Sequence, residues 1–179
     1  MLVTFGVQTL TGNAQPVLGD VLTAALANPF ETTNDPVATV ANTAIYQVGF
    51  RITIDPETVS QDSYKIIKIL SATTMQLSLE GSKGHNHANG AIIQLAIAAS
   101  DICVQALNGG AGAVVIGADN TVTAVPGGSA VFVLDKTTSP TENNVWRMTD
   151  SGQYNPVNTA DAWMIGTAGD KVIVYALVI

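Results

Sequence analysis

The sequence has few charged residues. Only 12% of its 179 residues are Asp, Glu, Lys or Arg, about half of the roughly 25% that is usual in soluble domains. The net charge is -7, and the seven basic residues stand singly along the chain, so they form no stripe that could neutralise phosphates. The acids are equally dispersed and make no calcium-binding loop. We therefore expect no nucleic-acid partner.

Long hydrophobic runs are also lacking, although apolar residues make up 47% of the chain and the mean hydropathy is +0.31. The longest apolar stretches are residues 21–27 and 172–179. Both fall far short of the roughly 20 residues that cross a bilayer as a helix. The sequence therefore predicts no membrane partner.

Cysteine and early basic residues are scarce too. The single cysteine, Cys103, excludes an internal disulfide, so stability must come from packing and assembly. The first basic residue is Arg51, so the amino terminus lacks the positive region of a signal peptide. We expect synthesis in a cytoplasm.

Short β-branched runs dominate the middle of the chain. Between residues 46 and 99, four runs of largely alternating apolar and polar residues are separated by turn-forming residues, which predicts a small antiparallel β module. The expected strands are residues 51–54, 64–70, 75–79 and 91–97.

The same pattern restarts after residue 100 with seven short runs and a turn signal about every 8 to 12 residues, which is typical of a β-sandwich or β-barrel. The expected strands are residues 102–106, 113–116, 121–125, 129–134, 145–148, 162–165 and 171–178. The sequence therefore predicts an all-β fold with two small antiparallel barrel or sandwich modules, residues 46–99 and 100–179.

The first 45 residues differ from the rest, because they are rich in Thr, Asn, Ala and Pro and show weak periodicity. Residues 1–45 are interpreted as an extended N-terminal arm with edge strands. The alternative is that they form the irregular edge of the first module.

Both histidines lie in Gly-His-Asn-His-Ala-Asn-Gly, residues 84–90. In an extended segment, the rings of His85 and His87 would share one face, but two ligands do not complete a zinc site. Asp62 or Glu80 could add a third ligand, though the spacing does not demand it. Three hypotheses stay open: an intrachain metal site, a site where several copies of His85 and His87 meet on a symmetry axis, and a solvated loop without a ligand. The turn residues favour the loop, so no metal or other cofactor is expected.

No catalytic motif stands out. The chain has no Gly-x-Ser-x-Gly sequence, and the glycine-rich residues 108–112 lack the lysine of a phosphate loop. A dyad of Cys103 with His85 or His87 stays open, but a cysteine between Ile and Val is typical of packing. We expect that the protein is not an enzyme.

The tryptophans raise the hypothesis of carbohydrate binding. Trp146 and Trp163 could stack on sugars, as could Tyr154. Both tryptophans lie in apolar predicted strands, which favours a core or a subunit interface over carbohydrate binding.

Several stretches resemble known virion modules. Small β modules of tailed-bacteriophage virion proteins are similar to residues 4–10, 47–54, 66–77 and 84–95. Those modules contain, in order, Val-Gly, a strand, a hairpin, His-x-x-Gly and a second strand. Another β module of phage head and tail proteins is similar to residues 115–123, 126–129 and 161–174. One departure is Phe50, which stands where such modules usually have an acid after Val-Gly.

This resemblance implies a capsid decoration, or cement, protein. Such a subunit is commonly a homotrimer, binds the major capsid protein on the outside of the shell and stabilises it. The implied location is the virion surface after synthesis in the cytoplasm of a bacterial host. A tail or baseplate component, or a carbohydrate-binding module on a fibre, are the alternatives.

The N-terminal arm is the expected site of capsid contact. It could add a strand to an edge of a neighbouring subunit. The candidate contact residues are Val3, Phe5, Val7 and Leu10. Deletion of residues 2–12 is then expected to abolish binding and to leave the isolated protein folded.

Overall fold

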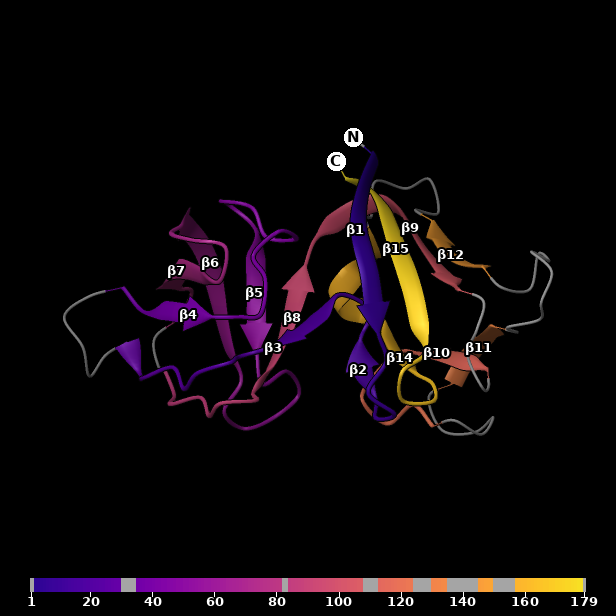
Figure 1. The fold of residues 1–179 in the computed structure, drawn as a ribbon, viewed down its shortest axis with the longest axis horizontal. Coiled ribbons are helices and arrows are strands. Elements are labelled where there is room, and N and C mark those ends of the chain that lie inside the picture. The colour runs from indigo at the N-terminus through magenta and orange to yellow at the C-terminus, as the bar shows by residue number, and fades with distance from the viewer. Residues whose placement is uncertain are drawn as a thin grey trace. The chain divides into compact units, whose positions relative to one another are not determined.

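A computed structural model gives the structure of the chain (Figure 1). It describes residues 2–29, 35–81, 84–107, 113–123, 130–134, 145–149 and 157–178. In these residues the regular structure is antiparallel β-sheet, with one named 3-10 turn, η3 (Thr159–Asp161), and no α-helix. The expected all-β class is confirmed. No helix in the described segments is long and apolar enough to cross a membrane.

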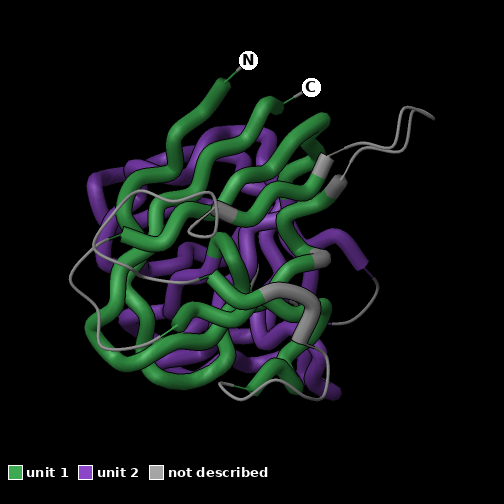
Figure 2. The backbone as a smooth tube through the Cα atoms, turned by 90° about the vertical axis from the view of Figure 1, so that its right-hand side faces the viewer, with its two compact units in different colours: residues 1–18, 97–179 green, residues 19–96 purple. Residues whose placement is uncertain are grey.

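The chain forms two compact units (Figure 2). Unit 1 combines residues 1–18 with residues 97–179, and unit 2 is residues 19–96. This differs from the expected division, because the first 45 residues do not form a separate arm. Their strands belong partly to unit 1 and partly to unit 2.

Unit 1 contains two sheets. In the first, the order is β1 (Leu2–Thr9), β15 (Lys171–Val178), β9 (Ala98–Ala106) and β12 (Val145–Thr149), and β13 (Val157–Asn158) also pairs with β9. In the second, the order is β11 (Ala130–Leu134), β10 (Val114–Gly117), β14 (Trp163–Ile165) and β2 (Gln15–Pro16). Six of the seven strands expected in this part of the chain are present. Residues 121–123 were expected to begin a strand, but Thr121 lies in a turn, where Asp119 accepts its backbone N–H at 2.8 Å, and residues 122–123 are irregular.

The core of unit 1 follows the two-residue period of its strands. On β9, Ile102, Val104 and Ala106 are buried, while the residues between them are half-buried. β15 alternates in the same way. Because successive side chains of a strand point to opposite faces, the first sheet has one face in the core and one outer face.

Unit 2 is a six-stranded sheet in the order β3 (Gly19–Val21), β8 (Ile92–Ala96), β5 (Arg51–Ile54), β6 (Asp62–Ile69), β7 (Thr74–Leu79) and β4 (Val37–Thr39). The four strands predicted for residues 46–99 are β5, β6, β7 and β8. The core of the unit contains the inward residues Ile52, Ile54, Tyr64, Ile66, Met75, Leu77, Ile93 and Leu95.

The N-terminal strand is an integral part of unit 1. β1 pairs with β15 from Leu2 opposite Leu177 to Thr9 opposite Lys171, with a bulge between Thr4 and Val7. Two of the four expected contact residues, Phe5 and Leu10, are buried in the core. The expectation that the protein stays folded without residues 2–12 is therefore corrected, because the deletion would remove an edge strand and open the core.

Candidate functional site

The histidine loop does not project into solvent as expected. It connects β7 to β8, and at its centre the backbone of His87 exchanges two hydrogen bonds with the backbone of Leu26, at 2.8 and 2.9 Å. These two hydrogen bonds hold the backbone of the loop at His87 against the backbone of the segment at Leu26. The His87 side chain is fully buried, so the interpretation as a solvated loop is wrong for this residue.

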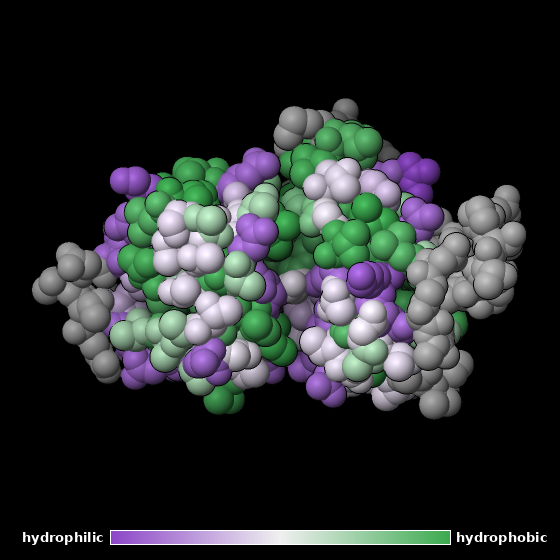
Figure 3. All heavy atoms as spheres, in the orientation of Figure 1, coloured by the Kyte–Doolittle hydropathy of each residue, from purple (hydrophilic) through white to green (hydrophobic). Residues whose placement is uncertain are grey.

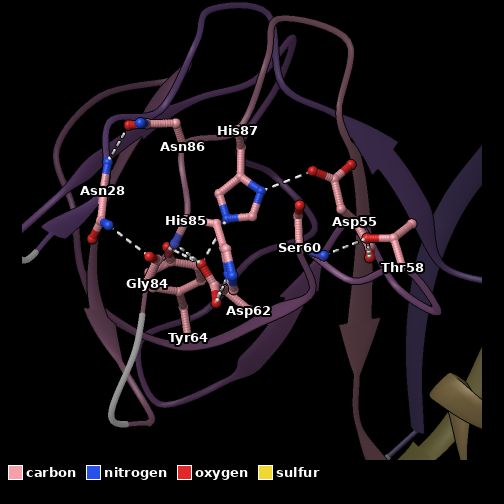
Figure 4. Close-up of polar contacts among 10 residues, drawn as sticks. All are labelled: Asn28, Asp55, Thr58, Ser60, Asp62, Tyr64, Gly84, His85, Asn86 and His87. Atoms are coloured by element: carbon pink, nitrogen blue, oxygen red, sulfur yellow. Dashed lines mark hydrogen bonds and ion pairs between the residues drawn. The ribbon is translucent and has the colours of Figure 1, made fainter.

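Each ring nitrogen of His87 faces a carboxylate (Figure 4). Nδ1 lies 2.8 Å from Oδ2 of Asp55, and Nε2 lies 3.0 Å from Oδ2 of Asp62. An ionised carboxylate only accepts hydrogen bonds, so both nitrogens must carry a proton for both bonds to form. The geometry therefore places a buried imidazole between two carboxylates, and each of its ring nitrogens has a carboxylate partner.

Asp62, the first residue of β6, is the most connected member of the cluster. It accepts the His85 backbone N–H at 2.6 Å, the Nδ1 atom of His85 lies 2.9 Å from its Oδ1, and Tyr64 donates to it at 3.3 Å. Burial alone would raise the pKa of Asp62, but the hydrogen bonds from His85 and His87 outweigh it and hold this pKa below its ordinary value. Asp62 is therefore a stable buried anion.

Tyr64 closes the cluster from the next inward position on β6, two residues after Asp62. Its ring meets the ring of His87 edge-on, with centroids 6.2 Å apart. Burial, together with the charge and hydrogen bond of Asp62, raises the pKa of Tyr64. The phenol therefore stays neutral and acts as a hydrogen-bond donor to Asp62.

Asp55 has a different environment from Asp62. It follows β5 and begins the 55–61 loop, and its side chain is 25% exposed. Its φ is 51° and that of Glu57 is 62°, in the left-handed region that residues other than glycine adopt at a cost. The bond to His87 fastens the start of this loop to the core of unit 2.

His85 is the member of the cluster that reaches solvent. Its ring is 39% exposed, while its Nδ1 is directed at Asp62. A metal site shared between copies would have to use this ring, because both nitrogens of His87 are already occupied. Within the described part of the chain, no three His, Cys, Asp or Glu side chains are placed to hold a metal ion.

Cys103 does not have the surroundings of an activated thiol. It lies on β9 next to Asp101, which is paired with Arg147 of β12. Burial, and then the charge of Asp101, raise the pKa of the Cys103 thiol against a smaller opposing effect of Arg147. Cys103 belongs to unit 1, whereas His85 and His87 belong to unit 2.

The two tryptophans occupy different environments. Trp163 is buried with Val115 and Val122 in a core cluster of unit 1. Its indole N–H has no acceptor among the described residues. Trp146 is half-buried on β12 opposite Val104, an inward residue of β9, and so lies on the core side of the first sheet.

On the outer face of the first sheet of unit 1, over β1 and β15, hydrophobic residues are interspersed with neutral and hydrophilic ones (Figure 3). The register places Leu2 opposite Leu177 and Val7 opposite Ile173. Leu2 is 69% exposed and Val7 is 56% exposed. We call the apolar residues on this side of β1 and β15 the outer face: Leu2, Val7, Ile173, Tyr175 and Leu177. Thr4, opposite Tyr175, lies between Leu2 and Val7 on this side of β1. Exposed apolar residues that share one face commonly mark an interaction site.

The open side of β1 adds a second feature to the outer face. β1 is the longest edge strand in the described structure, and it contains no charged residue and no proline. Soluble proteins usually protect long edges with charges, proline or short strands. Apart from the bulge between Thr4 and Val7, β1 has none of these protections, so its edge is suited to pair with another chain.

The four expected contact residues divide between core and surface. Val7 lies on the outer face, Val3 is half-buried, and Phe5 and Leu10 are buried. Sequence reasoning missed Leu2, whose exposure becomes clear only from its pairing with Leu177.

Comparison with known proteins gives no relative: no family model matches the chain, and no curated protein or solved structure matches it either.

Proposed function

We propose that this chain is a non-catalytic structural subunit of a phage virion, which binds the outside of the capsid shell as a decoration protein and stabilises it. The observation that carries the proposal is the outer face of unit 1 next to the open edge of β1. The sequence resemblance to phage virion modules supplies the partner, the major capsid protein.

The contact would use both backbone and side chains. A strand of the capsid protein would pair with the outer edge of β1, and its apolar side chains would cover Leu2 and Val7. Removing these side chains from water contributes on the order of 1 kcal/mol each. Because β1 carries no charge, no charged group has to be desolvated on this strand.

Stabilisation of the shell would follow from mass action. A subunit that binds the assembled lattice and not its dissociated parts shifts the equilibrium towards the lattice, by an amount set by affinity and concentration. The many copies on one shell add their contributions. Two units with extensive antiparallel pairing give a preorganised partner, which loses little conformational entropy on binding.

Co-sedimentation with capsids that lack this protein tests the proposal. The wild-type protein should pellet with capsids, and Val7→Lys should weaken binding by about tenfold or more, because it places a charge in the contact. Val48→Lys is the matched control, since Val48 is also well exposed, at 62%, but lies in unit 2. Wild-type protein that stays in the supernatant, or a Val7→Lys variant that binds as well as the control, would overturn the proposal.

A further inference from the structure

The 55–61 loop, which joins β5 to β6 in unit 2, presents one apolar side chain to solvent. Val59 is 97% exposed, the highest value among the exposed large apolar residues of the described structure. A single exposed valine is ordinary on a protein surface, so its exposure alone points to no partner. The way in which the loop holds Val59 supplies the further evidence.

The loop is fastened to unit 2 at its start. The backbone N–H of Asp55 donates to the carbonyl oxygen of Ile92 on β8 at 2.9 Å. The side chain of Asp55 has a separate attachment, because its Oδ2 lies 2.8 Å from Nδ1 of His87 (Figure 4). The next residue, Pro56, is buried. The position of the loop therefore does not depend on a single contact.

Hydrogen bonds within the loop tie its two ends together. The carbonyl oxygen of Asp55 accepts the hydroxyl of Thr58 at 2.8 Å and the Thr58 backbone N–H at 3.3 Å. After the tip, the backbone N–H groups of Ser60 and Gln61 donate to the hydroxyl and carbonyl oxygens of Thr58, both at 3.2 Å. The side chain of Gln61 accepts the Glu57 backbone N–H at 2.7 Å. Thr58 is thus bonded to the segments on both sides of the tip.

The loop keeps this shape against the ordinary backbone preferences of its residues. The φ of Asp55 is 51° and that of Glu57 is 62°, and no other residue except glycine has a positive φ in the described part of the chain. Such conformations persist only where the surrounding contacts impose them, and they concentrate at binding and catalytic sites. Here the contacts of Asp55, Thr58 and Gln61 impose them, so Val59 is held in a fixed place on unit 2.

We propose that the 55–61 loop is a second capsid contact, in which Val59 enters an apolar pocket of the major capsid protein. This inference rests on the proposed function and adds to it a contact made by unit 2. Because the loop is already ordered, binding costs little further conformational entropy. Glu57 is exposed near the tip, so a basic residue at the rim of the pocket complements it.

Two contacts on one chain make the attachment bivalent. The outer face and the edge of β1 belong to unit 1, whereas Val59 belongs to unit 2. Once one unit is bound, the other binds at an effective concentration set by the connection between them, so the whole subunit binds more tightly than either contact alone. Loss of the Val59 contact therefore weakens binding and leaves the β1 contact in place.

Relaxation of ¹⁵N nuclei in the free protein tests whether the loop is ordered before binding. The Val59 amide should have an order parameter of about 0.8, as in a rigid backbone. Thr58→Ala should lower this value, because it removes the hydroxyl that bonds to Asp55 and Ser60. Thr58→Ser keeps a hydroxyl and is the matched control. A wild-type value below about 0.6, typical of a flexible segment, would overturn the inference.

Co-sedimentation with capsids that lack this protein tests the contact itself. Val59→Asp should weaken binding by about tenfold or more, because it places a charge in the apolar pocket. Val48→Asp is the matched control in the same unit, since Val48 is 62% exposed, and it should bind like the wild type. Equal binding of Val59→Asp and Val48→Asp would overturn this inference and leave the proposed function standing. Wild-type protein that stays in the supernatant would overturn both.

Discussion

The Nε2 atom of His87 lies 3.0 Å from Oδ2 of Asp62, and both side chains are almost completely removed from solvent. The two residues are 25 positions apart in the sequence, and the contact joins the connection before β8 to the start of β6. A buried ion pair of this kind is costly to break, because removal of one partner leaves an uncompensated charge.

Loss of His87 should therefore destabilise the protein strongly. We expect His87→Ala to lower the free energy of unfolding by about 3 to 5 kcal/mol, as measured by urea denaturation. His85→Ala is the control, and it should cost about 1 kcal/mol or less, because its ring is partly exposed. Equal effects of the two substitutions would show that the pair with Asp62 and Asp55 is not the main contribution of His87.

Acid should remove the contribution of Asp62. Its pKa is lower in the folded protein than the ordinary value of about 3.9 in an unfolded chain. The unfolded state therefore binds the proton first, so the stabilisation is complete above that ordinary value and is lost as the pH falls through the folded pKa. The free energy of unfolding should fall in this acidic range, and less steeply in Asp62→Asn. Asp35→Asn, at an exposed carboxylate, is the control for loss of one negative charge. An Asp62→Asn variant as acid-sensitive as the control would contradict this assignment.

Leu10 tests whether the N-terminal segment belongs to the core. Leu10→Ala should lower the free energy of unfolding by about 2 to 5 kcal/mol, because its side chain is buried in unit 1. Val7→Ala, at an exposed position of the same segment, should change it by about 0.5 kcal/mol or less. A Leu10→Ala variant as stable as Val7→Ala would restore the interpretation of residues 1–45 as a detached arm.

Cys103 should react slowly with thiol reagents. Its raised pKa leaves little thiolate near neutral pH, and the thiolate is the reactive species. We expect modification by a disulfide reagent at roughly pH 7.5 to be about tenfold slower in the folded protein than in denaturant. A folded protein that reacts as fast as the denatured chain would exclude the structural interpretation of this cysteine.

The strands of unit 2 could be predicted because their signal is local. In β6 and β7 the buried positions alternate along the sequence itself, so the pattern in the chain indicates which residues face the core. The short strands β3 and β4 have only three residues each, too few for a period to show. They exist because β8 and β7 offer edges on which they can pair.

The histidine cluster could not be predicted for a different reason. The glycines and asparagines of residues 84–90 correctly indicated a connection, but the burial of His87 depends on Asp55 and Asp62, which lie 32 and 25 positions away. Nothing in the loop indicates those partners. A sequence signal was nevertheless present. Asp62 stands at the start of a strand whose next inward residues, Tyr64 and Ile66, are apolar. A carboxylate at such a position needs a buried partner.

Cryo-electron microscopy of capsids with and without this protein tests the central claim most directly. The proposed decoration role predicts additional density on the outside of the shell, into which unit 1 fits with Leu2 and Val7 against the capsid protein. Shells that show no additional density, or density in which β1 and the outer face point to solvent, would contradict it.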